Sequence, residues 1–279
     1  MIRIYDAHNH LQDERLGGSI AELPAIGLRA CVVNGTSEKD WPRVAELAQK
    51  FNWVIPAFGL HPWYAKERSP EWFETLRRYL DETPRACMGE IGLDRWMRDP
   101  DIADQEEVFA RQMELAAEQN SAVSIHCLKA WGPLEDALKH GRRPDRGFLI
   151  HSYGGSREMV SVFVKLGGYF SISGYFAHER KAAQCEVFKS IPIERLLVET
   201  DAPDMAGPFS QSGVNAPSNI LPTYEFAAKL RGMTLEEFAK TMEQNFERLF
   251  GPISSSGSKD TPPGPPNPAA TSSSAIPPA

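Results

Sequence analysis

Six side chains of metal-ligand type stand at or just after the ends of short apolar segments. His8 and His10 are separated by one residue, a spacing that points both imidazoles to one side of an extended chain. The others are Glu90, His126, His151 and Asp201. Burying such a group without a partner costs about 2–7 kcal/mol. A shared cation would satisfy the whole set, so the pattern predicts a metal centre.

The ligand types narrow the chemistry of this centre. Imidazoles with carboxylates suit Zn, Mn, Fe or Co better than Ca, and Mg is also admissible. Because the set exceeds what one tetrahedral zinc requires, we expect two divalent metal ions with Glu90 as the bridge. Such ions make hydroxide available at neutral pH. Asp201 can accept the proton, so Glu90 and Asp201 are the predicted catalytic residues.

Each residue also has a structural interpretation. A single histidine at a strand end is often a hydrogen-bonded structural residue, and Glu90 or Asp201 alone could pair with an arginine. The joint occurrence favours the metal centre, because only His140 and His178 of the seven histidines lie away from predicted strand ends. His61, in GLHPW beyond a strand, is interpreted as a substrate contact.

Eight repeats of one pattern must position these groups: a short apolar run, a turn, and a longer segment with helical spacing. No glycine-rich phosphate turn of the GxGxxG or Walker type follows any strand. The pattern therefore predicts an α/β fold, a (β/α)8 TIM barrel with its reactive groups at the carboxyl ends of the strands. The expected strands are 2–6, 30–35, 54–59, 86–92, 122–127, 147–152, 168–173 and 195–201, and the final helices are 221–231 and 234–250.

Composition sets the domain limits. Residues 1–251 are long enough for one barrel domain, whereas the Pro/Ser-rich residues 252–279 have little to bury and are expected to be a disordered tail.

The net charge of −7 gives no global attraction to polyanions. No membrane span or signal peptide is recognisable, and the four widely spaced cysteines indicate free thiols, so we expect a cytoplasmic protein. We also expect a monomer, because no heptad run marks a dimer interface.

The ordered motifs resemble the TatD-like metal-dependent hydrolases of the amidohydrolase superfamily. The resemblance runs from Asp6 to about Phe250 and rests on DAHNH, GLHPW, GEIGLD, IH, HSYGG and ETDAP, in that order. Gln105, Gln112 and NAPSNI give weaker support. It implies one metal at His8, His10 and Asp201, a second at His126 and His151, and Glu90 between them. Asp201 would be the general base, and His61 would contact a substrate phosphate.

The resemblance implies hydrolysis of phosphodiester bonds in DNA. The enzyme would act on single strands in the manner of a 3′-5′ exonuclease, and a hydroxide activated at two metals would attack the bond. Two departures concern the substrate. The usual arginine after the strand-five histidine is missing from HCLKAWG, where Lys129 is the nearest replacement, and the loop 203–217 contains no Lys or Arg. The two departures favour the alternative function, which is hydrolysis of a small metabolite amide, lactone or phosphoester. A third interpretation is a non-catalytic barrel that binds a partner through its PPGPP tail.

Overall fold

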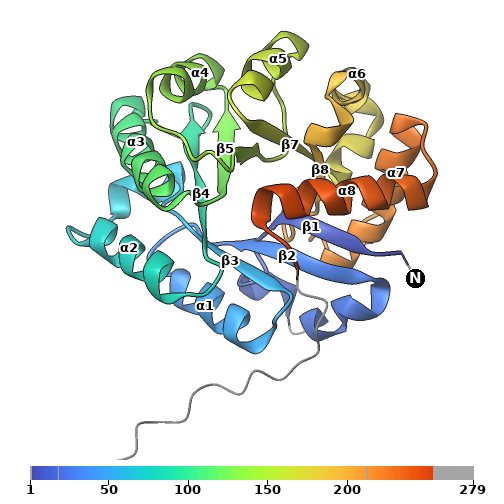
Figure 1. The fold of residues 1–279 in the computed structure, drawn as a ribbon, viewed down its shortest axis with the longest axis horizontal. Helices are drawn as coiled ribbons and strands as arrows, with labels where there is room; N and C mark the ends of the chain where they lie inside the picture. The colour runs from blue at the N-terminus through green and yellow to red at the C-terminus, as the bar shows by residue number, and fades with distance from the viewer. Residues whose placement is uncertain (1, 18, 212, 254–279) are drawn as a thin grey trace, which may run out of the picture.

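The computed structural model describes residues 2–17, 19–211 and 213–253. Eight parallel strands follow one another around a single sheet in the order β1 to β8, and helices surround them (Figure 1). The predicted TIM barrel is confirmed. The strands are β1 Ile4–Asn9, β2 Leu28–Asn34, β3 Val54–Phe58, β4 Cys87–Asp94, β5 Val123–Leu128, β6 Phe148–Ile150, β7 Gly168–Ser173 and β8 Leu196–Glu199.

An α-helix follows each strand as the pattern predicts, except that the described residues between β1 and β2 form the 3-10 segments η1 Glu14–Leu16 and η2 Ser19–Ile26. Most of the tail expected at 252–279 lies outside the described residues. Within the described ranges, no helix combines the length and apolar character needed to cross a bilayer. The helices are α1 Trp41–Lys50, α2 Trp72–Glu82, α3 Ile102–Gln119, α4 Trp131–His140, α5 Arg157–Lys165, α6 Ala182–Ser190, α7 Ile220–Arg231 and α8 Leu235–Phe250, with the 3-10 turn η3 at Pro62–Glu67.

Strand β1 begins later and runs further than the predicted range 2–6. The prediction ended the strand at Asp6, a charged residue, yet Asp6 is only 2% exposed. Its carboxylate accepts hydrogen bonds from the backbone N–H of Thr200 at 3.0 Å and from the Thr200 hydroxyl at 2.6 Å. With its oxygens satisfied, Asp6 is accommodated inside the strand, and β1 carries His8 within it.

The barrel closes between β1 and the segment that follows β8. The backbone N–H of Asp201 donates to the carbonyl of His8 at 3.0 Å, and that of His10 donates to the carbonyl of Ala202 at 2.8 Å. Lower on the same seam, the buried Tyr224 hydroxyl of α7 accepts from the Tyr5 N–H and donates to the Tyr5 carbonyl, both at 3.0 Å. The Tyr224 side chain thus makes the two hydrogen bonds to the Tyr5 backbone that a neighbouring strand would otherwise supply.

Apolar packing holds the helices on the barrel. The apolar face of α3 packs inward, since Val108, Phe109, Met113, Leu115 and Ala116 are all buried. Phe246 and Leu249 of α8 pack in a cluster with strand residues that include Val32. The four cysteines are free thiols, as expected.

Replacing Tyr224 with phenylalanine tests the seam. Tyr224→Phe leaves both polar groups of Tyr5 buried without their partner, so we expect the free energy of unfolding to fall by about 1–3 kcal/mol. Urea denaturation followed by circular dichroism measures this. Tyr79→Phe, whose ring packs against Trp41 and Phe58, is the matched control. Equal stability of the Tyr224 variant and wild type would contradict the role of the hydroxyl.

Candidate metal centre

The carboxyl ends of the strands surround a cavity of about 870 Å³, within the range of enzyme ligand pockets. Five of the six predicted metal ligands line its base and His8 lies buried beside them, although they come from β1, β4, β5 and the segments after β1, β6 and β8. His8 is fully buried there, and His10 is partly exposed. The structure therefore brings the whole set together.

Glu90 lies at the middle of the set, and each of its oxygens faces a different group of imidazoles. Its Oε2 is 3.4 Å from Nε2 of His8 and 3.3 Å from Nε2 of His10. Its Oε1 is 2.9 Å from Nε2 of His151 and 3.2 Å from Nδ1 of His126. Asp201 joins the first group, with Oδ1 3.5 Å from Nε2 of His10. The geometry thus contains two ligand groups that share one carboxylate.

These distances fit divalent cations. Bonds of about 2.1 Å at tetrahedral angles place neighbouring ligand atoms about 3.4 Å apart, and the ligand atoms of His8, His10 and Asp201 lie within 4.8 Å of one another. Nε2 of His8 is buried and makes no hydrogen bond. An orphaned ring nitrogen among carboxylates is what a metal ligand requires, because coordination uses its lone pair.

The outer hydrogen bonds of two histidines direct their lone pairs toward the centre. Nδ1 of His10 lies 2.8 Å from the carbonyl of Asn34, which can only accept, so in the neutral ring Nδ1 carries the proton and Nε2 faces Glu90 and Asp201 with its lone pair. Nε2 of His126 similarly donates to Oδ2 of Asp94 at 3.1 Å, which leaves Nδ1 for the centre. Both imidazoles are preorganised as ligands.

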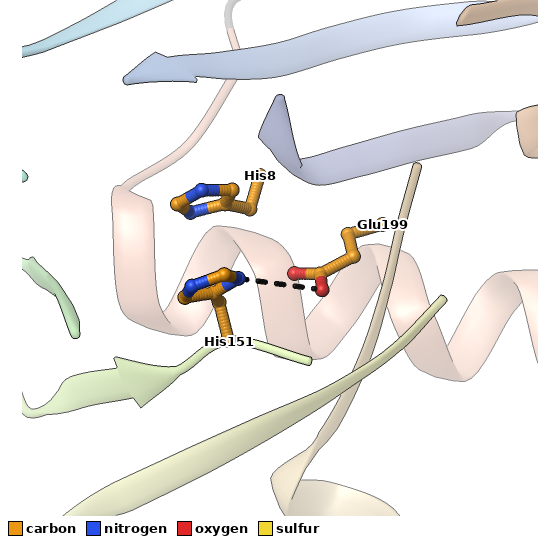
Figure 2. A group of neighbouring side chains, drawn as sticks. All are labelled: His8, His151 and Glu199. Atoms are coloured by element: carbon orange, nitrogen blue, oxygen red, sulfur yellow. Dashed lines mark ion pairs between the residues drawn. The ribbon is translucent and has the colours of Figure 1, made fainter. Parts of the chain in front are cut away.

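His8 and His151 form a stacked pair beside a second buried carboxylate (Figure 2). Their ring centroids are 4.0 Å apart, with the planes 8° from parallel. Nδ1 of His151 is 3.7 Å from Oε1 of Glu199, a fully buried side chain. Glu199 also accepts from the Ser152 N–H at 2.7 Å and the Ser171 hydroxyl at 2.5 Å. The carboxylate is therefore fixed on the side of His151 that faces away from Glu90.

His61 has the opposite tautomer. Its Nδ1 accepts from the backbone N–H of Trp63 at 3.2 Å, so the neutral ring carries its proton on Nε2. That nitrogen is 3.4 Å from Oε1 of Glu90, and burial lowers the pKa of His61 to about 4. At neutral pH His61 therefore presents an N–H donor to the cavity, which suits an anionic substrate oxygen better than a metal ion.

The electrostatics of the centre favour cations. Burial acts to raise the pKa of Glu90, but the imidazoles, His61 foremost, outweigh it and hold that pKa well below its usual range. Burial acts to lower the pKa of His10 and His151, yet the neighbouring carboxylates raise it well above the ordinary value. Protons are thus held where divalent cations would bind, so cation binding is expected to release protons.

Backbone geometry also holds the ligands in place. Asp201 adopts a left-handed conformation with φ of 55°, an uncommon state for a residue other than glycine. The turn directs the chain away from β8 immediately after Glu199, which explains why the strand ends before the predicted residue 201. At Gly92, a Cβ atom would lie 2.0 Å from the backbone oxygen of His126, so only glycine permits this approach of β4 to β5.

The remaining predicted residue, Lys129, and several residues that were not predicted lie outside the set of six candidate metal ligands. Lys129 is exposed at the end of β5 and, among the described residues, is not one that lines the cavity. Sequence reasoning missed Asp94 and Glu199, although both stand inside the motifs GEIGLD and ETDAP. It also missed three cations of the cavity wall, which are Arg15, Lys39 and Arg43.

Comparison with known proteins identifies the family of the chain. The family described as TatD related DNase matches residues 5–251. The chain belongs to this family. Among similar proteins, the uncharacterized metal-dependent hydrolase YabD of Bacillus subtilis is 30% identical over 88% of this chain and 98% of its own length. A 3′-5′ ssDNA/RNA exonuclease TatD of Pantoea ananatis is 31% identical over 86% of this chain and 94% of its own length.

A solved structure supports the same assignment. The TatD homologue YJJV of Escherichia coli superposes with a TM-score of 0.84 at 27% identity, covering 89% of this chain and 98% of its own. The chain is therefore a metal-dependent hydrolase of the TatD family, with buried His, Glu and Asp clusters suited to metal ions. The number and identity of those ions stay predictions.

Glu199→Gln tests the carboxylate behind His151. Losing its charge weakens the orientation and basicity of His151, so we expect metal affinity to fall about 10-fold to 100-fold while the fold is kept. Competition with a chelator, followed by elemental analysis, measures the affinity. Glu186→Gln, at an exposed surface carboxylate, is the control. Unchanged metal retention in the Glu199 variant would contradict this role.

Proposed function

We propose that this hydrolase cleaves phosphodiester bonds at the 3′ end of single-stranded DNA. The observation that carries the proposal is the Glu90 carboxylate shared by two ligand groups, an arrangement suited to a pair of cations about 3.5–4 Å apart on a phosphoryl group. The Pantoea ananatis relative, named as a 3′-5′ ssDNA/RNA exonuclease, supports the same substrate class.

The chain's own residues divide the work around the scissile phosphate. Divalent cations, when bound, polarise the phosphoryl group and lower the pKa of water, so that hydroxide is available near neutral pH. Burial acts to raise the pKa of Asp201, but the imidazole of His10 and its neighbours lower it, so the carboxylate is ionised and can accept the proton of the attacking water. The Nε2–H of His61 donates to a phosphoryl oxygen and stabilises its developing charge.

The charges at the cavity rim favour a second candidate substrate, which is a small metabolite amide, lactone or phosphoester. Arg15 pairs with Asp13 at 2.8 Å and with Asp204 at 2.9 Å. Lys39 and Arg43 pair with Glu67 and Glu14 at 2.8 and 3.3 Å. Because each cation already faces a carboxylate, the wall offers no surplus of positive charge to a long phosphate backbone.

Cleavage of an end-labelled single-stranded oligonucleotide tests the proposal. With added Mg or Mn, we expect metal-dependent shortening from the 3′ end. Glu90→Gln and Asp201→Asn should each lower turnover at least about 100-fold, because one removes the shared charge and the other the proton acceptor. Circular dichroism checks that both variants remain folded. A fully active Glu90→Gln variant would refute the assignment.

Failure of the wild-type protein to cut the oligonucleotide, once elemental analysis finds metal bound, would exclude the DNA substrate. The small-molecule alternative is then tested with amide, lactone and phosphomonoester substrates.

Salt dependence provides a further prediction. Binding to single strands weakens with a slope of about −0.7 in log–log form for each phosphate neutralised. With three cations on the wall, all paired, we expect the slope for oligonucleotide binding to be no steeper than about −2. Fluorescence anisotropy at increasing KCl concentrations measures it. A much steeper slope would mean that an extended phosphate track exists elsewhere on the molecule.

A further inference from the structure

An exposed indole stands at the wall of the cavity. Trp41 and Trp72 are buried in the core, whereas Trp63 is 53% exposed and lies on the turn η3, two residues after His61. Its ring meets the His61 ring edge-on at 5.1 Å and lies 6.4 Å from the ring of His126. A large exposed aromatic side chain thus lines the cavity directly beside the candidate metal centre.

The indole is fixed, although it is exposed. Its Nε1–H donates to Oδ2 of Asp94 at 2.7 Å, and the same oxygen accepts from Nε2 of His126 at 3.1 Å. Asp94 is only 1% exposed, and its Oδ1 accepts from the backbone N–H of Trp96 at 2.6 Å. One carboxylate therefore sets the position of both the indole and a candidate metal ligand.

Helix α3 anchors the two segments that carry this arrangement. The Gln112 side chain accepts from the Leu60 N–H at 2.7 Å and donates to the Leu60 carbonyl at 3.2 Å, just before His61. Gln105 pairs in the same way with the backbone of Asp94, at 2.8 and 3.1 Å. Because these contacts preset the indole, little conformational entropy remains to be lost when a ring packs on it.

We propose that Trp63 is a stacking platform for the nucleobase of the nucleotide at the reacting end. The proposal rests on the phosphodiesterase function above and deepens it. Every base has an aromatic face, so stacking gives affinity without sequence preference. It also supplies the binding that the paired cations of the wall do not, since the contact is made to the base rather than to the phosphate.

Two variants separate the ring from its hydrogen bond. Trp63→Phe keeps an aromatic face and loses the N–H, whereas Trp63→Gln keeps an N–H donor and loses the face. Trp96→Ala is the matched control, because Trp96 is 71% exposed yet, among the described residues, is not one that lines the cavity. Each protein is assayed with Mn on two oligonucleotides, one with a normal 3′ nucleotide and one whose 3′ nucleotide is abasic.

We expect Trp63→Gln to raise the KM for the normal oligonucleotide about 10-fold to 100-fold and to leave the abasic substrate unchanged. Trp63→Phe should retain most of the preference for a base, and Trp96→Ala should behave as wild type. An equal loss on both substrates in Trp63→Gln would overturn the stacking platform, because the residue would then act only through Asp94 and His126.

A fluorescence titration separates failure of this inference from failure of the proposed function. Stacking of deoxyadenosine monophosphate on Trp63 should quench tryptophan emission in wild type and in Trp96→Ala, but not in Trp63→Phe. Quenching without cleavage of either oligonucleotide would refute the nuclease proposal and keep the base-binding site. Cleavage by wild type with equal KM values on the two oligonucleotides, and no quenching, would refute the stacking platform alone.

Discussion

The carboxylate of Glu90 is the group on which the centre depends. Its two oxygens face imidazoles from four different parts of the chain, and it is nearly fully buried. A negative charge in such a place requires positive charge beside it, because desolvating a lone carboxylate costs far more than a fold of this size can offset. The parallel barrel makes the arrangement possible, since the carboxyl ends of its strands converge on one region.

The surroundings of that carboxylate assign different roles to chemically identical side chains. A carbonyl or carboxylate behind His10 and His126 leaves their lone pairs facing inward, whereas a backbone N–H behind His61 turns a proton inward. The outer hydrogen bond therefore decides whether an imidazole can act as a ligand or as a donor. Asp94 extends the same principle, since one oxygen fixes both His126 and the exposed indole of Trp63.

The sequence was sufficient to predict the barrel and the gathering of the six metal-ligand residues. Strand periodicity places residues at strand ends, and in a parallel barrel all such ends meet. The outer partners were not predictable in this way, because the contact between Glu199 and His151 depends on the register of β8 against its neighbours. The boundary at Asp6 failed for a related reason, since a charged residue inside a strand is tolerated only through a partner 194 positions away.

The roles of Gln105 and Gln112 also became clear only in three dimensions. Both are polar residues among the apolar residues of α3, yet their side chains are buried. Gln112 pairs with the backbone of Leu60 just after β3, and Gln105 pairs with that of Asp94 at the end of β4. Trp63 and the cations of the wall were missed because exposed loop residues carry no periodic signal. Their geometry depends on these buried amides and ion pairs.

The seam between β1 and β8 has a consequence for the order in which the protein is made. His8 and His10 emerge from the ribosome early, but the hydrogen bonds that join them to Asp201 and Ala202 need the end of β8. A nascent chain that lacks this segment holds the two imidazoles with Glu90 but without the carboxylate of Asp201. The first group of candidate ligands is therefore complete only once nearly the whole barrel has been synthesised, so metal binding there would be coupled to completion of the fold.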